Sequence, residues 1–191
     1  THDQEEAFAR ADRGTLLHAG QIVQVGPPTE IYRAPASAWV AEFLGLENLF
    51  DAEVTGEHQI KTALGPLKLP EEIALPEVGA TGSLLVMPWG VHLVDGETSA
   101  GDKALNTVRG EVVHRTFHGR VFVIWIARND VHLRMTFEVG RSVPEIGKEV
   151  AVRLGPDGLQ WLDSRTGHAE PVVRGGEGAG VGTGAVGGLG G

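Results

Sequence analysis

The sequence predicts a mainly β protein, with a short α/β part at the N-terminus followed by a small OB-like barrel or sandwich. Two observations support this fold class. Short runs of β-branched and aromatic residues, separated by glycine and proline, recur between residues 84 and 162, and strands at a spacing of roughly 8–12 residues are typical of a sandwich or small barrel. In residues 1–45, helical and strand patterns alternate instead. We therefore divide the chain into residues 1–45, a β domain at 46–165 and a glycine-rich tail at 166–191.

The first predicted element is a helix over residues 2–12. Thr1 and Gln4 have the spacing of a capping box, and apolar residues recur at helical spacing from Ala7 to Ala11. Asp3 and the acidic residues after it suit the positive end of a helix. We interpret them as helix-start residues and not as catalytic carboxylates.

A β-hairpin follows. Residues 15–18 and 21–25 are strand-like and flank Ala19 and Gly20, a separation that suits a two-residue hairpin turn. The sequence Gly-Pro-Pro at 26–28 stops the second strand because proline cannot continue a ladder of backbone hydrogen bonds.

Two short helices complete the first part. We expect Thr29 to cap a helix that runs to Tyr32. A second helix should end at Gly45. Its predicted apolar face consists of Trp39, Val40, Phe43 and Leu44.

The β domain carries six predicted strands. They cover residues 84–87, 108–117, 120–127, 131–139, 150–154 and 159–162. His118-Gly119 and Asn129-Asp130 supply turn residues for two consecutive antiparallel hairpins. The run 120–127 is apolar at nearly every interior position, so we expect it to be covered on both faces or paired with another chain. It is the candidate interface strand.

Composition excludes several function classes. The net charge is −9, with 16 scattered Lys and Arg residues, which argues against a nucleic-acid partner. There is no cysteine, hence no disulfide framework or thiolate metal site. No run approaches the roughly 20 apolar residues of a membrane span, and we expect a soluble, cytoplasmic chain. The sequence has no G-x-x-x-x-G-K-[ST] phosphate loop.

An ordered series of short motifs runs through the first part of the chain. The motifs are Thr-His-Asp-Gln-Glu-Glu-Ala at 1–7, Ala-Asp-Arg at 11–13, Gly-Gln-Ile-Val-Gln-Val-Gly-Pro-Pro-Thr-Glu-Ile-Tyr at 20–32, Arg-Ala-Pro-Ala at 33–36 and Val-Ala-Glu-Phe-Leu-Gly at 40–45. The series resembles the switch-histidine segment and the end of the nucleotide-binding domain in ABC importer ATPases of the maltose, polyamine and ferric-iron type. Residues 48–163 resemble, more weakly, the TOBE regulatory domain of those proteins.

The resemblance implies that the chain is a C-terminal fragment of a transport ATPase subunit. Residues 1–45 would be the remnant of its nucleotide-binding domain, and His2 would be the switch histidine that contacts the γ-phosphate. An imidazole there can donate a hydrogen bond to a phosphate oxygen. The parent would use ATP and Mg²⁺. The fragment lacks the phosphate cradle and carboxylates of phosphoryl transfer, so we expect it to hold no cofactor and to hydrolyse no ATP.

The resemblance also implies partners. The parent would work with transmembrane permease subunits at the inner face of the cell membrane, and the β domain would form a homodimer that holds or modulates two ATPase subunits. Ferric iron, polyamine, sugar and sulfate all stay open as the solute. Two departures from the family concern Met87-Pro88-Trp89, where relatives commonly have Arg-Pro-Glu, and Gly14, where a branched residue is usual.

The β domain also allows two other interpretations. His114 and His118 share a strand face with Thr116 and could bind a metal with His132, but partly exposed sheet residues are commoner, and we expect no metal site. An oxyanion or metabolite site could instead be lined by arginines. These are Arg109, Arg115, Arg120, Arg128, Arg134 and Arg141. A freestanding binding module of this kind, or a ligand-free dimerisation domain, is the alternative to a regulatory fragment.

Overall fold

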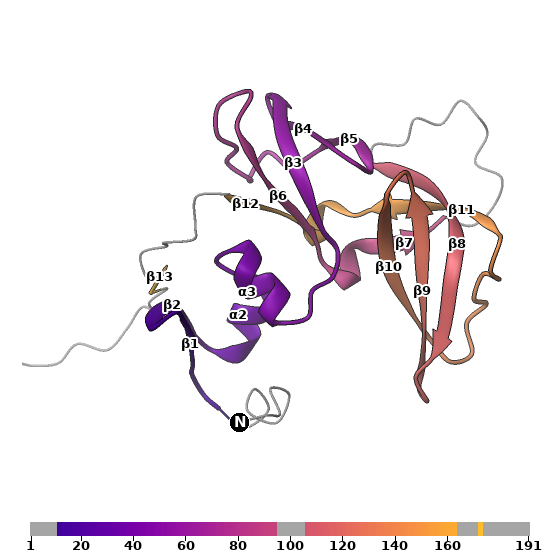
Figure 1. Ribbon diagram of the computed structural model, residues 1–191, viewed down its shortest axis with the longest axis horizontal. Coiled ribbons are helices and arrows are strands. Elements are labelled where there is room, and N and C mark those ends of the chain that lie inside the picture. The colour runs from indigo at the N-terminus through magenta and orange to yellow at the C-terminus, as the bar shows by residue number, and fades with distance from the viewer. Residues whose placement is uncertain (1–10, 95–105, 164–171, 174–191) are drawn as a thin grey trace, which may run out of the picture.

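The computed structural model describes residues 11–94, 106–163 and 172–173 (Figure 1). It is mostly β, as predicted, with three antiparallel or mixed sheets and two short helices among these residues. The predicted helix over residues 2–12 lies outside the described residues except for Ala11 and Asp12, which are not helical.

The predicted N-terminal hairpin is confirmed. Strands β1 (Gly14–His18) and β2 (Gln21–Gly26) pair in antiparallel register, with His18 opposite Gln21. Ala19 and Gly20 have φ angles of 47° and 81°. Positive φ at both central residues is the signature of a type I′ turn, whose twist matches that of the strands it joins. The short strand β13 (Val172–Val173) adds to β2 in parallel.

Two helices follow the hairpin, and two details of their prediction were wrong. Helix α2 (Pro28–Arg33) begins two residues before the Glu30 start that a Thr29 cap implies, and it has no side-chain cap, because proline at the first helical position already has the required φ. Helix α3 (Ala38–Phe43) buries Val40 and Ala41, whereas Phe43 is 37% exposed. Because α3 has only six residues, it contacts the sheet through a single turn.

Helix α3 begins and ends through local hydrogen bonds. The Val40 N–H donates to Ser37 Oγ at 3.3 Å, which is an N-cap bond. At the other end Gly45 has φ 72°, and the Leu46 N–H donates to the Ala41 carbonyl at 3.0 Å. This is the Schellman arrangement that glycine favours, and it confirms the predicted end at Gly45.

Two five-stranded sheets form the β domain. The first sheet has the order β12-β6-β3-β4-β5 and the second has the order β10-β9-β8-β11-β7. The strands of the first are β3 (Leu49–Gly56), β4 (Gln59–Thr62), β5 (Gly65–Lys68), β6 (Thr81–Val86) and β12 (Leu159–Asp163). Those of the second are β7 (Val91–Leu93), β8 (Thr107–Phe117), β9 (Val121–Arg128), β10 (Val131–Glu138) and β11 (Glu149–Leu154). All six predicted strands are present, whereas β3, β4, β5 and β7 were not predicted.

The two sheets are two copies of one structural unit. In each, a three-stranded meander (β3-β4-β5 or β8-β9-β10) is followed by a strand (β6 or β11) that returns to pair with the first strand of the meander. The register agrees closely: Val54 pairs with Ile60 as Val112 pairs with Ile126, and both ladders have a bulge directly after these pairs. The β domain is therefore a tandem repeat, which the sequence analysis missed.

The last strand of each repeat is exchanged with the other. Strand β7 follows β6 in sequence but pairs with β11, and β12 follows β11 but pairs with β6. The orange β12 lies beside β6 in Figure 1. The crossing is made by two 3₁₀ turns, η1 (Pro88–Gly90) and η2 (Pro156–Gly158).

The crossing point is held by reciprocal contacts. The Met87 N–H donates to the Gly158 carbonyl and the Gly155 N–H donates to the Gly90 carbonyl, both at 2.7 Å. A Cβ on Gly90 or Gly158 would collide with the backbone of the other glycine. The two backbones can approach this closely only because both residues lack a side chain.

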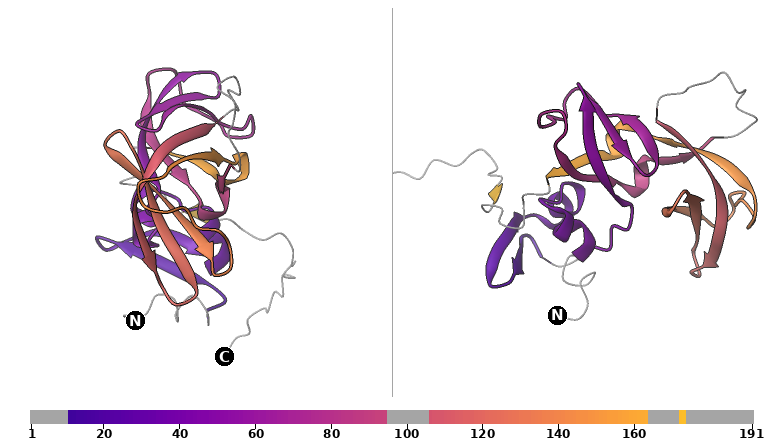
Figure 2. Two further views of the ribbon diagram at one scale, coloured as in Figure 1. Left: turned by 90° about the vertical axis from the view of Figure 1, so that its right-hand side faces the viewer. Right: turned by 45° about the horizontal axis from the view of Figure 1, so that its top comes forward.

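One hydrophobic core joins the two sheets, and smaller clusters attach the N-terminal part. The main core takes residues from both sheets, with Phe50, Leu84, Ile124, Ile126 and Val152 among its buried members. On the outer side of the first sheet, Ala41 and Leu46 pack on Leu85, Met87 and Leu162. Figure 2 shows helices α2 and α3 against the purple sheet and away from the second sheet.

Strand β9, the candidate interface strand, lies in the middle of the second sheet between β10 and β8. Its inward residues Ile124 and Ile126 are buried in the main core. On its outward face Val123 is 1% exposed between its neighbours on the sheet, whereas Trp125 is only partly buried. The core therefore covers only one face of β9. Both edges of the strand pair with neighbouring strands of the same sheet, β10 and β8.

Candidate functional site

The predicted switch histidine, His2, lies outside the described residues, as does the glycine-rich tail apart from Val172 and Val173. The structure therefore leaves the role of His2 a prediction. The sites that can be tested lie in the β domain.

The candidate metal ligands do not come together. His114 Nε2 lies 2.8 Å from Thr116 Oγ1 in a hydrogen bond, while His118 sits in the turn beyond the end of β8. Among the described residues, no group of three or more His, Cys, Asp or Glu side chains could hold a metal ion.

The arginines do not converge on a common pocket. Arg115 lies over the ring of Phe122, with its guanidinium carbon 4.6 Å from the ring centre, and Arg128 donates to the Arg109 carbonyl at 3.0 Å. Arg120 is exposed in a turn, and Arg141 lines a separate depression beside β7 and β10. Arg134 is combined with an aromatic neighbour, Trp125, and an acidic one, Glu47.

A row of side chains crosses the outer face of the second sheet. Because Leu133 and Met135 point into the core, Arg134 between them points outward. In register, Arg134 is opposite Trp125 and Trp125 is opposite His114. The His114 and Trp125 rings touch edge to face, with centres 4.9 Å apart.

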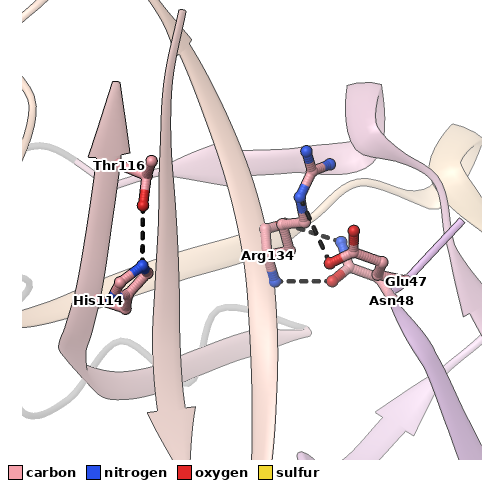
Figure 3. A network of polar contacts seen from close by, with 5 residues as sticks. All are labelled: Glu47, Asn48, His114, Thr116 and Arg134. Atoms are coloured by element: carbon pink, nitrogen blue, oxygen red, sulfur yellow. Dashed lines mark hydrogen bonds and ion pairs between the residues drawn. The ribbon is translucent and has the colours of Figure 1, made fainter. Parts of the chain in front are cut away.

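The segment that follows helix α3 holds Arg134 in place. The Asn48 side chain accepts from the Arg134 N–H at 2.7 Å and donates to the Arg134 carbonyl at 2.8 Å. Glu47 Oε2 lies 3.5 Å from Arg134 Nε. Figure 3 shows that the two Nη atoms of the guanidinium point away from Glu47 and Asn48.

The Arg134 guanidinium makes few polar contacts with the described residues. Its Nε atom is buried and makes no hydrogen bond to a described residue, so the ion pair with Glu47 is its close polar contact. The Arg134 side chain is 31% exposed and that of Glu47 is 53% exposed. Both charges therefore face a surface depression of about 300 Å³, whose walls include Trp125, His132 and Leu49.

The pair of hydrogen bonds from an asparagine side chain to the N–H and carbonyl of one residue, here called the asparagine clasp, occurs in both repeats. The row of charged and aromatic side chains does not. Asn106 accepts from the Lys68 N–H at 2.8 Å and donates to the Lys68 carbonyl at 2.7 Å, just as Asn48 does to Arg134. The strand register shows which residues of the first repeat correspond to the row. Arg134 corresponds to Lys68, Trp125 to Gln59 and His114 to Gly56. The fold therefore requires the asparagine but not the aromatic and charged row.

Comparison with curated proteins shows a consistent set of relatives. The iron(III) import ATP-binding protein FbpC of Streptomyces avermitilis is 39% identical over 153 residues, which cover 80% of this chain and 41% of that protein. The spermidine/putrescine import ATP-binding protein PotA of Methylococcus capsulatus is 35% identical over 62% of this chain and 31% of its own length. The sulfate/thiosulfate import ATP-binding protein CysA 2 of Chromobacterium violaceum is 46% identical over 46% of this chain and 23% of its own length.

The chain is homologous to part of the ATP-binding subunits of ABC importers. It spans about two fifths of the length of the FbpC relatives that it matches. No family model matches it. Among solved structures, the cytoplasmic molybdate-binding protein ModG aligns with a TM-score of 0.49 and 14% identity, over 61% of this chain and 95% of that one. No helix within the described residues is long and apolar enough to span a membrane.

Proposed function

We propose that this chain is the regulatory and subunit-joining portion of an importer's ATP-binding subunit. The observation that carries the proposal is the similarity to FbpC proteins over 80% of the chain. In this role the parent binds ATP and Mg²⁺ at the cytoplasmic face of permease subunits and couples hydrolysis to solute uptake. The names of the relatives include a metal ion, polyamines and oxyanions, so they do not select one solute.

The proposed division of labour follows the division of the chain. Residues 1–45 form the end of the ATPase domain and the tandem repeat forms the regulatory domain. Two features support a rigid connection: the packing of Ala41 and Leu46 on the first sheet, and a hydrogen bond from the Gln160 side chain to the Arg33 carbonyl at 2.5 Å. A movement of the ATPase end would then be passed to the repeats as a whole.

His2 is the proposed switch residue of the parent. Its imidazole would donate a hydrogen bond to the γ-phosphate as negative charge develops there. The chain carries no phosphate loop, so nucleotide binding would rest on a preceding domain.

The proposed homodimer contact lies at the far end of the second sheet. Strands β8, β9 and β10 are longer than β3, β4 and β5, and their end exposes Phe117 by 54% and Val139 by 57%. Large apolar side chains that gather at an exposed end are typical of an interaction surface.

A chimera tests the proposal. The C-terminal two fifths of the Streptomyces avermitilis FbpC protein would be replaced with this chain, and ATP hydrolysis and solute uptake would be measured with the cognate permease. We expect both activities to be retained and His2→Ala to reduce hydrolysis by a factor of about 10² or more, the scale of a lost transition-state hydrogen bond. A well-folded chimera that hydrolyses ATP equally with and without His2 would contradict the proposal.

The dimer contact has its own test. Sedimentation of the chain should show a dimer, and Phe117→Asp should convert it to a monomer, because a carboxylate in an apolar contact is strongly unfavourable. Val78→Asp is the control, since Val78 is also a well-exposed apolar residue, at 66%, and lies in the loop before β6 of the other repeat. A chain that is monomeric at high concentration would refute this contact.

A further inference from the structure

The strongest unexplained feature is the row Arg134, Trp125 and His114 with its neighbour Glu47. The two repeats agree in strand register, bulge position and asparagine clasp. Where they differ, the second repeat has a guanidinium, an indole and an imidazole in place of Lys68, Gln59 and Gly56. Since one repeat folds without these side chains, the strand topology by itself does not require them.

The charges at this place select the kind of ligand. Arg134 and Glu47 form an adjacent positive and negative pair, with Nε and Oε2 separated by 3.5 Å, and both are partly open to solvent. A simple anion would bind Arg134 but would meet the carboxylates of Glu47 and of Asp130, which also lines the depression, and a simple cation would meet the guanidinium. A ligand with a carboxylate next to an ammonium can satisfy both members and leave their ion pair intact.

The guanidinium is prepared for a carboxylate. Its Nη atoms point away from Glu47 and Asn48 (Figure 3), and parallel N–H groups of arginine bind a carboxylate in a bidentate manner. The two Asn48 bonds fix the backbone of Arg134, and the side chain extends from that fixed point past Glu47, which lies 3.5 Å from its Nε atom.

The remaining walls combine apolar and polar groups. Beside the charged pair, the depression of about 300 Å³ is lined by the apolar Trp125, Leu49, Phe50 and Val131 and by the polar Asp130 and His132. This volume is at the lower limit of small-molecule sites, which are usually apolar with a few well-placed polar groups. Trp125 is supported on its other side by His114, whose ring is oriented by Thr116.

We propose that this depression binds a free α-amino acid with an apolar side chain. The carboxylate lies on the Arg134 Nη atoms, the ammonium on Glu47 and the side chain against Trp125. Because Glu47 lies four residues after the end of α3 at Phe43 and just before β3, the ligand sits where the N-terminal part meets the two repeats. The proposal concerns binding and does not depend on the transport role.

The test is an NMR titration of the whole chain with phenylalanine and with leucine. We expect shifts at the Trp125 indole N–H and at Arg134 Nε, with saturation. Phenylalaninamide, which lacks the carboxylate, and 3-phenylpropionate, which lacks the ammonium, should each bind at least about tenfold more weakly, because each loses a charge-assisted interaction. Saturable shifts of this kind that depend on both charged groups would support the proposal.

Two variants localise the site. Arg134→Gln keeps the backbone bonds to Asn48 and should weaken phenylalanine binding by about tenfold to a hundredfold, whereas Arg120→Gln, in an exposed turn, should leave it unchanged. If Arg134→Gln does not fold, Glu47→Gln and the ligand series on the unaltered chain decide the matter. The proposal is overturned if neither amino acid shifts Trp125, or if the amide or the propionate binds as tightly as phenylalanine.

Discussion

Asn48 and Asn106 are the residues on which the alignment of the two sheets depends most directly. Each is buried, at 5% and 9% exposed, and each gives one donor and one acceptor to the backbone of the other repeat's edge strand. An amide can do this because it has both functions on one planar group. Each also accepts, through its own carbonyl, a hydrogen bond from the returning strand at 2.9 Å. The two side chains therefore act as equivalent links between the sheets.

Removal of either link should destabilise the domain by a similar amount. Asn48→Ala and Asn106→Ala each leave a backbone N–H and a carbonyl without their partner, at a cost of about 1–3 kcal/mol in the free energy of unfolding. Urea denaturation of both variants measures this. Gln59→Ala, at an exposed strand position, is the control and should change little. A neutral result for either asparagine would mean that the clasp is incidental.

Ala19 offers a change in the opposite direction. It adopts φ 47° in a type I′ turn, a conformation that costs an L-residue with a Cβ roughly 1–2 kcal/mol. Ala19→Gly should raise the melting temperature, because glycine adopts positive φ without that cost, offset in part by its greater freedom in the unfolded chain. Thermal unfolding followed by circular dichroism detects this. Lowered stability would show that the turn differs in solution.

At the scale of elements, the exchange of β7 and β12 is the defining feature. Each repeat completes the other's sheet, so neither contains all five strands of its own sheet. The exchange passes through Gly90 and Gly158, where a single methyl group would collide with backbone atoms. Backbone atoms cannot move aside as the end of a flexible side chain can, so the crossing tolerates few substitutions at these two glycines.

Gly158→Ala tests the crossing. Overpacking at a backbone contact should cost about 2–3 kcal/mol, and the double variant with Gly90→Ala should not be additive because the two residues touch. Gly119→Ala is a useful comparison, since its site has φ 74° but open space around it. Gly119→Ala therefore carries the cost of a positive φ for alanine without a collision with other atoms. Equal effects at Gly119 and Gly158 would argue against a tight crossing.

For the whole molecule, the shared core and exchanged strands predict one cooperative unfolding transition for the two repeats. The core contains residues of both sheets, so one repeat cannot open without exposing the apolar surface of the other. Calorimetric and van't Hoff enthalpies should agree. A separate early transition confined to one repeat would contradict this expectation.

Several elements could be predicted from sequence because their signals are local. The Ala19-Gly20 turn, the end of α3 at Gly45 and the hairpin turns at His118-Gly119 and Asn129-Asp130 depend on a few adjacent residues. Strand β3 also alternates, with Phe50, Ala52 and Val54 buried, and could have been found. Its short partners β4 and β5 have too few residues for periodicity to be decisive.

The sequence by itself determined the mainly β class, the first hairpin and the resemblance to importer ATPases, since these depend on short-range pattern and on motif order. Only the tertiary structure decided that the β domain is a tandem repeat with exchanged strands, because the longer β8–β10 of the second repeat disrupt the spacing that would reveal it. It also decided the surroundings of Arg134. Arg134 meets Glu47 and Trp125 through strand register and a clasp from Asn48, 86 residues away, and contacts of that range are set by packing rather than by local pattern.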